Sequence, residues 1–179
     1  GGKLPVSVVS LNSGSIYRIS FFGTDPAGND APKTIVENIT FDNIMPVVEI
    51  EIPTSNTYIN SPEISYTLSE KLKEGNMALT YVAGSQDNNA PHTAALNEDQ
   101  RNEGTYELIN FSDIKWMDGA TYDLTFSGID FANNNSNLVK VSNVTYDITP
   151  PIISIDNLNN NIYINNIKLS YTLSEPIAN

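Results

Sequence analysis

The chain has 179 residues, 40% of them hydrophobic and 17% charged, a composition sufficient for one compact core of ordinary domain size. Acidic side chains outnumber basic ones by 21 to 9, and the net charge of −12 argues against binding to nucleic acids or anionic membranes. The absence of cysteine excludes disulfides and thiolate metal sites, and no apolar run approaches the roughly 20 residues of a membrane span.

The predicted elements are short β-strands. Alternation of apolar and polar residues, with many β-branched and aromatic side chains, marks six segments in chain order: 47–52, 63–68, 77–82, 105–111, 121–128 and 138–146. Polar turn sequences separate several of them, at 85–92, 97–104 and 131–137. No segment carries an apolar stripe at helical spacing over a useful length.

The alternation also predicts a core and a fold. Alternate residues from Ile64 to Leu68 share one strand face, as do those from Tyr122 to Phe126. About seven short strands in roughly 100 residues are typical of an immunoglobulin-like β-sandwich, and MDGATY ending at Tyr122 fits a tyrosine corner. We therefore predict an all-β chain of this class.

The sequence repeats itself at a separation of 105 residues. YTLSE occurs at 66–70 and again at 171–175, each time after YIN, and GSIYRISFFGTDPAGN at 14–29 aligns with GATYDLTFSGIDFANN at 119–134. Internal similarity at one fixed separation indicates tandem units of one architecture. NSGSIY, which ends at Tyr17, is the counterpart of the predicted tyrosine corner.

The repeat predicts one complete unit between two partial units. Residues 46–150 form the complete Ig-like repeat, 1–45 the C-terminal part of the repeat before it, and 151–179 the N-terminal part of the next. The initial GGKLPVSVV has neither an initiator methionine nor a signal peptide, so we expect the chain to be a piece of a longer protein.

The partial units are expected to expose apolar residues that a whole unit would cover. These residues include Ile19, Phe21, Leu169, Tyr171 and Leu173. We expect the flanks either to fray or to complete a partial sandwich with another copy of the chain, because unpaired strands invite strand addition.

Several of the quoted motifs carry a family resemblance. GTDPAGN and GIDFANN, followed by NITFD or NVTYDITPP and then YTLSEP, resemble the bacterial Ig-like repeats that occur in tandem in very large secreted and surface proteins, adhesins among them. The resemblance covers essentially the whole chain. It implies a non-catalytic spacer in an extracellular stalk, with neighbouring repeats as partners and any host or surface ligand bound by a domain outside this chain.

The sequence departs from the family pattern at two places. Gly28 of the first turn becomes Asn133 in the second, and TPP at 149–151 reads IMP at 44–46. The two turns and the two junctions therefore need not have the same geometry or stiffness.

Three acidic residues are predicted to meet at the junction before the complete unit. In an antiparallel sandwich, the loop after the second strand, the turn after the penultimate strand and the tail of the preceding unit share one end. This geometry brings together Glu70, Asp130 and Asp42. At the next junction the corresponding residues are Asp147 and Glu175, and the third would lie beyond residue 179.

A bridging calcium ion is one hypothesis for these acidic residues. Three carboxylates repel one another unless they are protonated, solvated or bridged by a cation, and Ca²⁺ takes about 6–8 oxygen ligands. The resemblance implies the same, since calcium stiffens the joints in some relatives. Asp25, the repeat partner of Asp130, is the matching candidate ligand. The alternative is that Asp25 and Asp130 cap their own turns while Glu70 is merely exposed.

Nothing in the sequence predicts an enzyme. His92, the single histidine, has no nucleophile or metal-binding motif around it. Trp116 could stack on a sugar, but its repeat partner is Leu11, which favours a core role. The alternative function is a carbohydrate- or protein-binding accessory module of a secreted enzyme, which would show an exposed aromatic row or a pocket of convergent polar groups.

Overall fold

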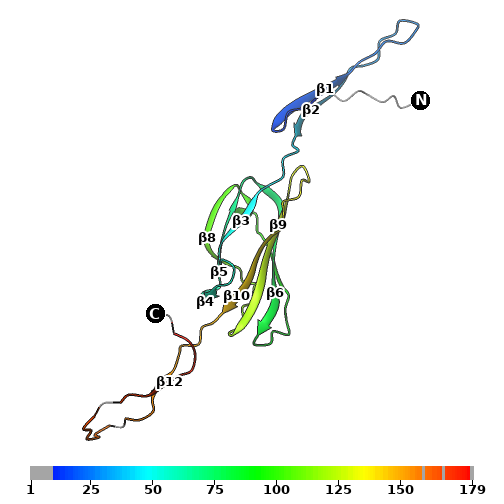
Figure 1. Ribbon diagram of the computed structural model, residues 1–179. Coiled ribbons are helices and arrows are strands. Elements are labelled where there is room, and N and C mark those ends of the chain that lie inside the picture. Colours follow the sequence, from blue (N-terminus) through cyan, green and yellow to red (C-terminus); the bar gives the residue numbers. More distant parts are fainter. Residues whose placement is uncertain (1–9, 159, 167, 178–179) are drawn as a thin grey trace.

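The computed structural model describes residues 10–158, 160–166 and 168–177. Figure 1 shows an elongated arrangement, in which a sandwich occupies the middle and a two-stranded hairpin lies beyond each end. Within the described ranges the structure is all-β apart from one 3-10 helix, η1 (Asp99–Arg101). None of its elements in those ranges is a helix of the length and apolarity needed to cross a membrane.

The middle of the chain forms two sheets. The three-stranded sheet is antiparallel and has the order β3 (Val48–Ile52), β5 (Glu63–Leu68) and β8 (Gly104–Asn110). The five-stranded sheet has the order β4 (Tyr58–Ile59), β10 (Val139–Tyr146), β9 (Ala120–Asp130), β6 (Leu72–Gly84) and β7 (His92–Ala95). Only β4 runs parallel to its neighbour, β10. The chain therefore crosses between the sheets after β3, β4, β5, β7 and β8.

The core lies between the two sheets, and all its buried members fall between Val48 and Val144. On β9 every second residue from Ala120 to Asp130 is buried, the period-2 pattern of a strand with one covered face. The opposite wall comes from β5, where the ring of Tyr66 meets that of Phe126 edge-on at 5.3 Å. Each large side chain buried in this way contributes about 1.5–3 kcal/mol.

The predicted tyrosine corner is present, and it occurs twice. The backbone N–H of Met117 donates to the Tyr122 hydroxyl at 3.1 Å, which ties the start of β9 to the loop before it. At the equivalent place in the first hairpin, the N–H of Asn12 donates to the Tyr17 hydroxyl at 2.6 Å. Both bonds span five residues, as the repeat of the sequence requires.

Two strands in the sandwich were not predicted, and one is longer than predicted. β7 begins at His92, inside a segment predicted as a turn, because four residues with two alanines give no strand signal. β4 has only two residues. β6 begins at Leu72 rather than at residue 77, since the polar stretch that contains Gly75 interrupts the alternation there.

The flanking hairpins have the same strand register as the sandwich. They pair β1 (Ser15–Phe21) with β2 (Thr34–Phe41), and β11 (Ile153–Ile155) with β12 (Tyr171–Leu173). Shifted by 105 residues, every β1–β2 pair falls on a β9–β10 pair, and every β11–β12 pair falls on a β3–β5 pair. Even the register shift next to Tyr17 recurs next to Tyr122.

Candidate functional site

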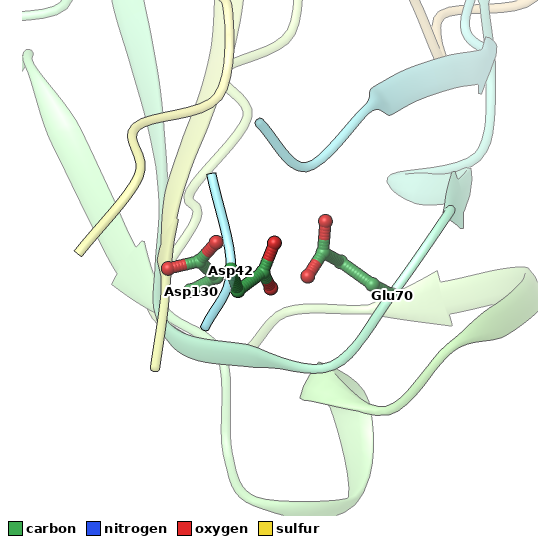
Figure 2. A group of neighbouring side chains, drawn as sticks. All are labelled: Asp42, Glu70 and Asp130. Carbon is green, nitrogen blue, oxygen red and sulfur yellow. The ribbon is translucent and has the colours of Figure 1, made fainter. Parts of the chain in front are cut away.

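Three carboxylates converge at the end of the sandwich that faces the first hairpin. Asp42 follows β2 directly, Glu70 lies two residues after β5, and Asp130 is the last residue of β9. One carboxylate oxygen from each lies within 4.8 Å of the others. Figure 2 shows Asp42 between the other two residues, with the Glu70 carboxylate directed toward the aspartates. The prediction that these residues meet is confirmed.

Asp130 is the buried member of this acidic triad, with only 1% of the residue exposed. Its Oδ1 accepts the backbone N–H of Asn134 at 2.8 Å, and its Oδ2 accepts the Asn134 side-chain amide at 2.8 Å. The same amide donates to the backbone carbonyl of Asp42 at 3.2 Å. Asp130 thus caps its own turn, as the alternative hypothesis predicted, and the cap also binds the segment before the sandwich.

Asp42 and Glu70 have different environments within the triad. Asp42 Oδ1 accepts the Ser13 hydroxyl at 2.9 Å and the Ile44 N–H at 3.0 Å, which fixes this carboxylate. Burial raises the pKa of Glu70 above its usual value, and the negative charges of Asp42, Asp130 and Glu103 raise it further. The charged form of Glu70 is therefore the one that the fold disfavours.

The geometry of the triad fits a calcium ion. Two oxygens that each lie about 2.4 Å from one calcium ion are at most about 4.8 Å apart, and the three carboxylate oxygens lie within that distance of one another. All the donors are hard oxygen atoms, the ligands that Ca²⁺ and Mg²⁺ prefer. Backbone carbonyls and water would have to supply the rest of a set of about 6–8 ligands.

The second junction brings Asp147 and Glu175 to one hollow of about 420 Å³, which Tyr58 and Pro151 also line. Asp147 Oδ1 accepts the Thr149 N–H at 3.1 Å, just as Asp42 accepts a backbone N–H two residues later. Both acidic residues predicted for this junction therefore line the same hollow, and the third residue of the prediction lies beyond residue 179.

Asp25 is a turn cap and nothing more in the described part of the chain. Its Oδ1 accepts the N–H groups of Ala27 at 2.9 Å and Asn29 at 2.8 Å, and its Oδ2 accepts the Asn29 side-chain amide at 2.8 Å. These bonds, led by that from the Asn29 side chain, lower the pKa of Asp25. Among the described residues, the only group of three acidic or imidazole side chains spaced for a metal is the acidic triad.

A second polar cluster was missed by the sequence analysis. Asp87 is 5% exposed and lies beneath the tyrosine corner. Its Oδ2 accepts the Tyr122 hydroxyl at 2.7 Å and lies 2.8 Å from His92 Nε2. These two side-chain bonds, the Tyr122 bond first, lower the pKa of Asp87 to about 2. His92 therefore holds a buried carboxylate in place, and the same carboxylate oxygen also accepts a hydrogen bond from Tyr122 of the core.

Trp116 packs against the core. Its ring meets Tyr122 edge-on at 5.5 Å and lies 6.1 Å from the ring of Tyr146, while Nε1 is buried without a hydrogen-bond partner among the residues that the structure describes. The exposed aromatic residues of 46–150 are Tyr58, on β4 at the level of the start of β9, and Phe131, directly after the end of β9. They form no aromatic row on a sheet face.

No protein-family model matches the chain, and the curated proteins contain no match to it. What can be said of its function therefore rests on the residues and geometry described above. They define an all-β chain with a two-sheet sandwich and an acidic cluster at the entry of the chain into it.

Proposed function

We propose that the chain is a series of Ig-like repeats that acts as a non-catalytic spacer in a large extracellular bacterial protein, such as the stalk of an adhesin. The observation that carries the proposal is the common register of the flanking hairpins and the sandwich at a separation of 105 residues. In this proposal residues 46–150 are one whole repeat, and the hairpins belong to the repeats before and after it.

The arrangement of the elements supports a spacing role. The chain enters the sandwich at one end and leaves it at the other, so that successive units extend the molecule instead of clustering (Figure 1). Each unit folds around its own core, and only the short junctions set the angle between neighbours. The net charge of −12 favours solubility and discourages lateral association of such a rod.

Calcium at the junctions would stiffen this rod. A cation held by Asp42, Glu70 and Asp130 would join the tail of one repeat to two loops of the next and would neutralise their mutual repulsion. Asp147 and Glu175 would do the same at the following junction, with a third carboxylate from the next repeat. The spacer role does not depend on the ion, because the Asn134 amide already bridges the first junction.

Small-angle X-ray scattering of the full chain tests the spacer role. An elongated particle, whose longest dimension stays constant on dilution, is the expected result. A compact particle, in which the hairpins fold back on the sandwich, would contradict the proposal.

The calcium hypothesis has a separate test. Millimolar Ca²⁺, compared with EDTA and with the same concentration of Mg²⁺, is expected to raise the melting temperature and to narrow the distribution of particle lengths. If neither quantity changes, calcium has no role at the junction, whether or not the particle is elongated.

A further inference from the structure

Three features of the sandwich have no part in the proposed spacer role: the single histidine, the single tryptophan and a buried carboxylate. All three line one hollow of about 510 Å³, between the loop after β6 and the loop before β9. We call it the Trp116 hollow, and its walls are Asp87, Asn89, His92, Lys115, Trp116 and Met117. Its volume lies within the range of about 300–1,000 Å³ that small-molecule sites occupy.

The Trp116 hollow is separate from the junction with the hairpin that follows. The chain leaves the sandwich from β10, whereas the hollow adjoins the end of β6, and β9 lies between these two strands. At the exit the N–H of Asp147 donates to the Ile59 carbonyl at 2.9 Å. By the 105-residue register Asp147 is the counterpart of Asp42, the residue that meets the sandwich at the first junction. The hollow and the junction therefore use different residues.

One wall of the hollow is particular to this repeat. Tyr122 of the corner has a counterpart in Tyr17, and both hydroxyls accept the same backbone bond. The three wall residues just before Tyr122 have no such match, because Lys115, Trp116 and Met117 align with Ser10, Leu11 and Asn12. The common architecture explains the tyrosine that recurs, and it does not explain three neighbouring residues that all change.

Asp87 fixes the polar groups of the hollow. Its side chain is 2% exposed, and it accepts hydrogen bonds from the Tyr122 hydroxyl, from His92 Nε2 and from the Asn89 N–H. The Tyr122 bond and then the His92 bond lower the pKa of Asp87 to about 2, so this group is a carboxylate at neutral pH and accepts only. His92 Nε2 therefore carries the proton, and Nδ1 of the neutral imidazole remains as an acceptor for a ligand.

The other walls add donors and an apolar surface. Lys115 and Asn89 are exposed, and their side chains supply an ammonium donor and an amide that both donates and accepts. Trp116 Nε1 has no hydrogen-bond partner among the described residues, so no hydrogen bond holds the indole against a small rotation. The indole and the side chain of Met117 form the apolar side of the hollow.

We propose that the Trp116 hollow binds a neutral sugar. The apolar face of the sugar ring packs on the indole, and its hydroxyl groups, which both donate and accept, bind His92 Nδ1 and the Lys115 ammonium. The ligand is neutral because the charges of Asp87 and Lys115 balance within the hollow, while the net charge of −12 repels anionic sugars. Asp87 is a positioning residue. The proposal goes beyond the spacer role and does not depend on it.

The single tryptophan provides a direct test. Its fluorescence and its one indole N–H resonance both report on the hollow. The full chain is titrated with the methyl glycosides of glucose, galactose, mannose and N-acetylglucosamine, and with galacturonate as the anionic sugar. We expect a saturable change in fluorescence with at least one neutral glycoside, together with shifts of the indole resonance and of the amides of 87–92 and 115–117. The absence of a saturable change with every neutral glycoside would overturn the proposal, as would shifts confined to other residues or equally tight binding of galacturonate.

Two substitutions restore the residues of the first hairpin and test the walls. Lys115→Ser keeps the fluorescence and should weaken binding by about tenfold or more, because a hydrogen bond from a charged donor is lost. The matched control Lys33→Ser removes the same charge from an exposed side chain between β1 and β2 and should not change the affinity.

Trp116→Leu, followed by calorimetry, should abolish binding, and its melting temperature shows whether the sandwich is intact. Unchanged binding in Lys115→Ser, or in a Trp116→Leu chain, would refute the assigned site. The scattering profile of the chain is a separate measurement, so the sugar site and the spacer role can fail independently.

Discussion

Replacing Glu70 with glutamine separates the two effects that the acidic triad has on the protein. Without a cation, the variant should be more stable than the parent, because the folded state holds the Glu70 carboxylate beside Asp42 and Asp130. The pKa of Glu70 is raised above 4.5 by burial and by these charges. A raised pKa means that the charged group costs stability at neutral pH, and that the cost disappears as the pH falls toward 4.5.

The size of the effect follows from the geometry. Two unit charges within about 4.8 Å of each other repel by at least about 3.5 kcal/mol at an effective dielectric constant of about 20, and by at least about 0.9 kcal/mol in bulk water. Glu70 is half-buried at the rim of the sandwich, so the value for bulk water is the better guide to its repulsion by Asp42 and to its repulsion by Asp130. We expect a gain of about 1–2 kcal/mol, or about 5 °C in the melting temperature of a domain of this size.

Calcium should invert this order. At a calcium concentration of about 100 times the dissociation constant, binding to the folded state alone stabilises the parent chain by about 2.7 kcal/mol. The glutamine variant has lost one of three carboxylate ligands and should gain little. The assay is thermal unfolding by circular dichroism in EDTA and in Ca²⁺, at pH 7 and pH 5.

The control is Glu107→Gln, which removes the same charge from an exposed side chain of β8 and should change the stability by less than about 0.5 kcal/mol in every buffer. If Glu70→Gln is no more stable than the parent in EDTA, the repulsion does not exist in solution. If parent and variant respond equally to calcium, the triad is not the binding site.

Three further substitutions test the packing and the turns of the sandwich. Tyr122→Phe removes one hydrogen bond to a backbone N–H and one to a buried carboxylate, so it should cost about 2–3 kcal/mol in urea unfolding, whereas Tyr17→Phe should leave that transition unchanged. The pKa of Asp87 is lowered to about 2, so its contribution to the free energy of unfolding is complete above pH 3.8 and is lost as the pH falls toward 2. Asp87→Asn should therefore make the stability fall less steeply at acid pH. An unchanged dependence of stability on pH would refute this. Gly84 has a positive φ, and Gly84→Ala would also push a Cβ into the backbone carbonyl oxygen of Gly119, so this substitution should cost more than about 2 kcal/mol of stability. Gly104→Ala also has a positive φ, but its Cβ meets open space, and it should cost about half as much. Equal losses of stability would show that φ alone matters.

The sequence was most informative where the alternation was long and one face was buried. β9 and β10 were predicted to within about two residues, because period-2 patterning sets both the element and its register. The meeting of Asp42, Glu70 and Asp130 followed from the topology alone, since the direction of each strand determines which loops share an end. No side-chain detail was needed for that step.

The cluster around Asp87 could not be found in the same way. Asp87 lies in the polar run SQDNNAPH, which by average composition is an exposed turn. Its burial depends on Tyr122, 35 residues later, and on the proximity of His92, which the structure places at the start of an unpredicted strand. Pairings between distant polar residues leave no local pattern, so only the folded chain shows them.

The comparison of Asp25 with Asp130 shows why the two explanations of the acidic residues are not alternatives. Both residues accept the same hydrogen bonds from an asparagine four residues later, so both are caps. A carboxylate has about four lone-pair sites, and capping uses two of them, which leaves capacity for a cation. Asp130 differs in being buried and in having Asp42 and Glu70 beside it, whereas the described chain places no such acidic neighbours beside Asp25.

The acidic triad is therefore a property of the junction and not of the turn motif. Two of its members belong to the sandwich, and the third, Asp42, belongs to the segment between β2 and the sandwich. A chain that begins at residue 46 would keep the Asp130 cap and its core, and it would lose the repulsion of Asp42 on Glu70 together with any response to calcium. If that shorter chain responds to calcium as the full chain does, the ion binds within one unit, and the junction owes its stiffness to the Asn134 amide and to packing alone.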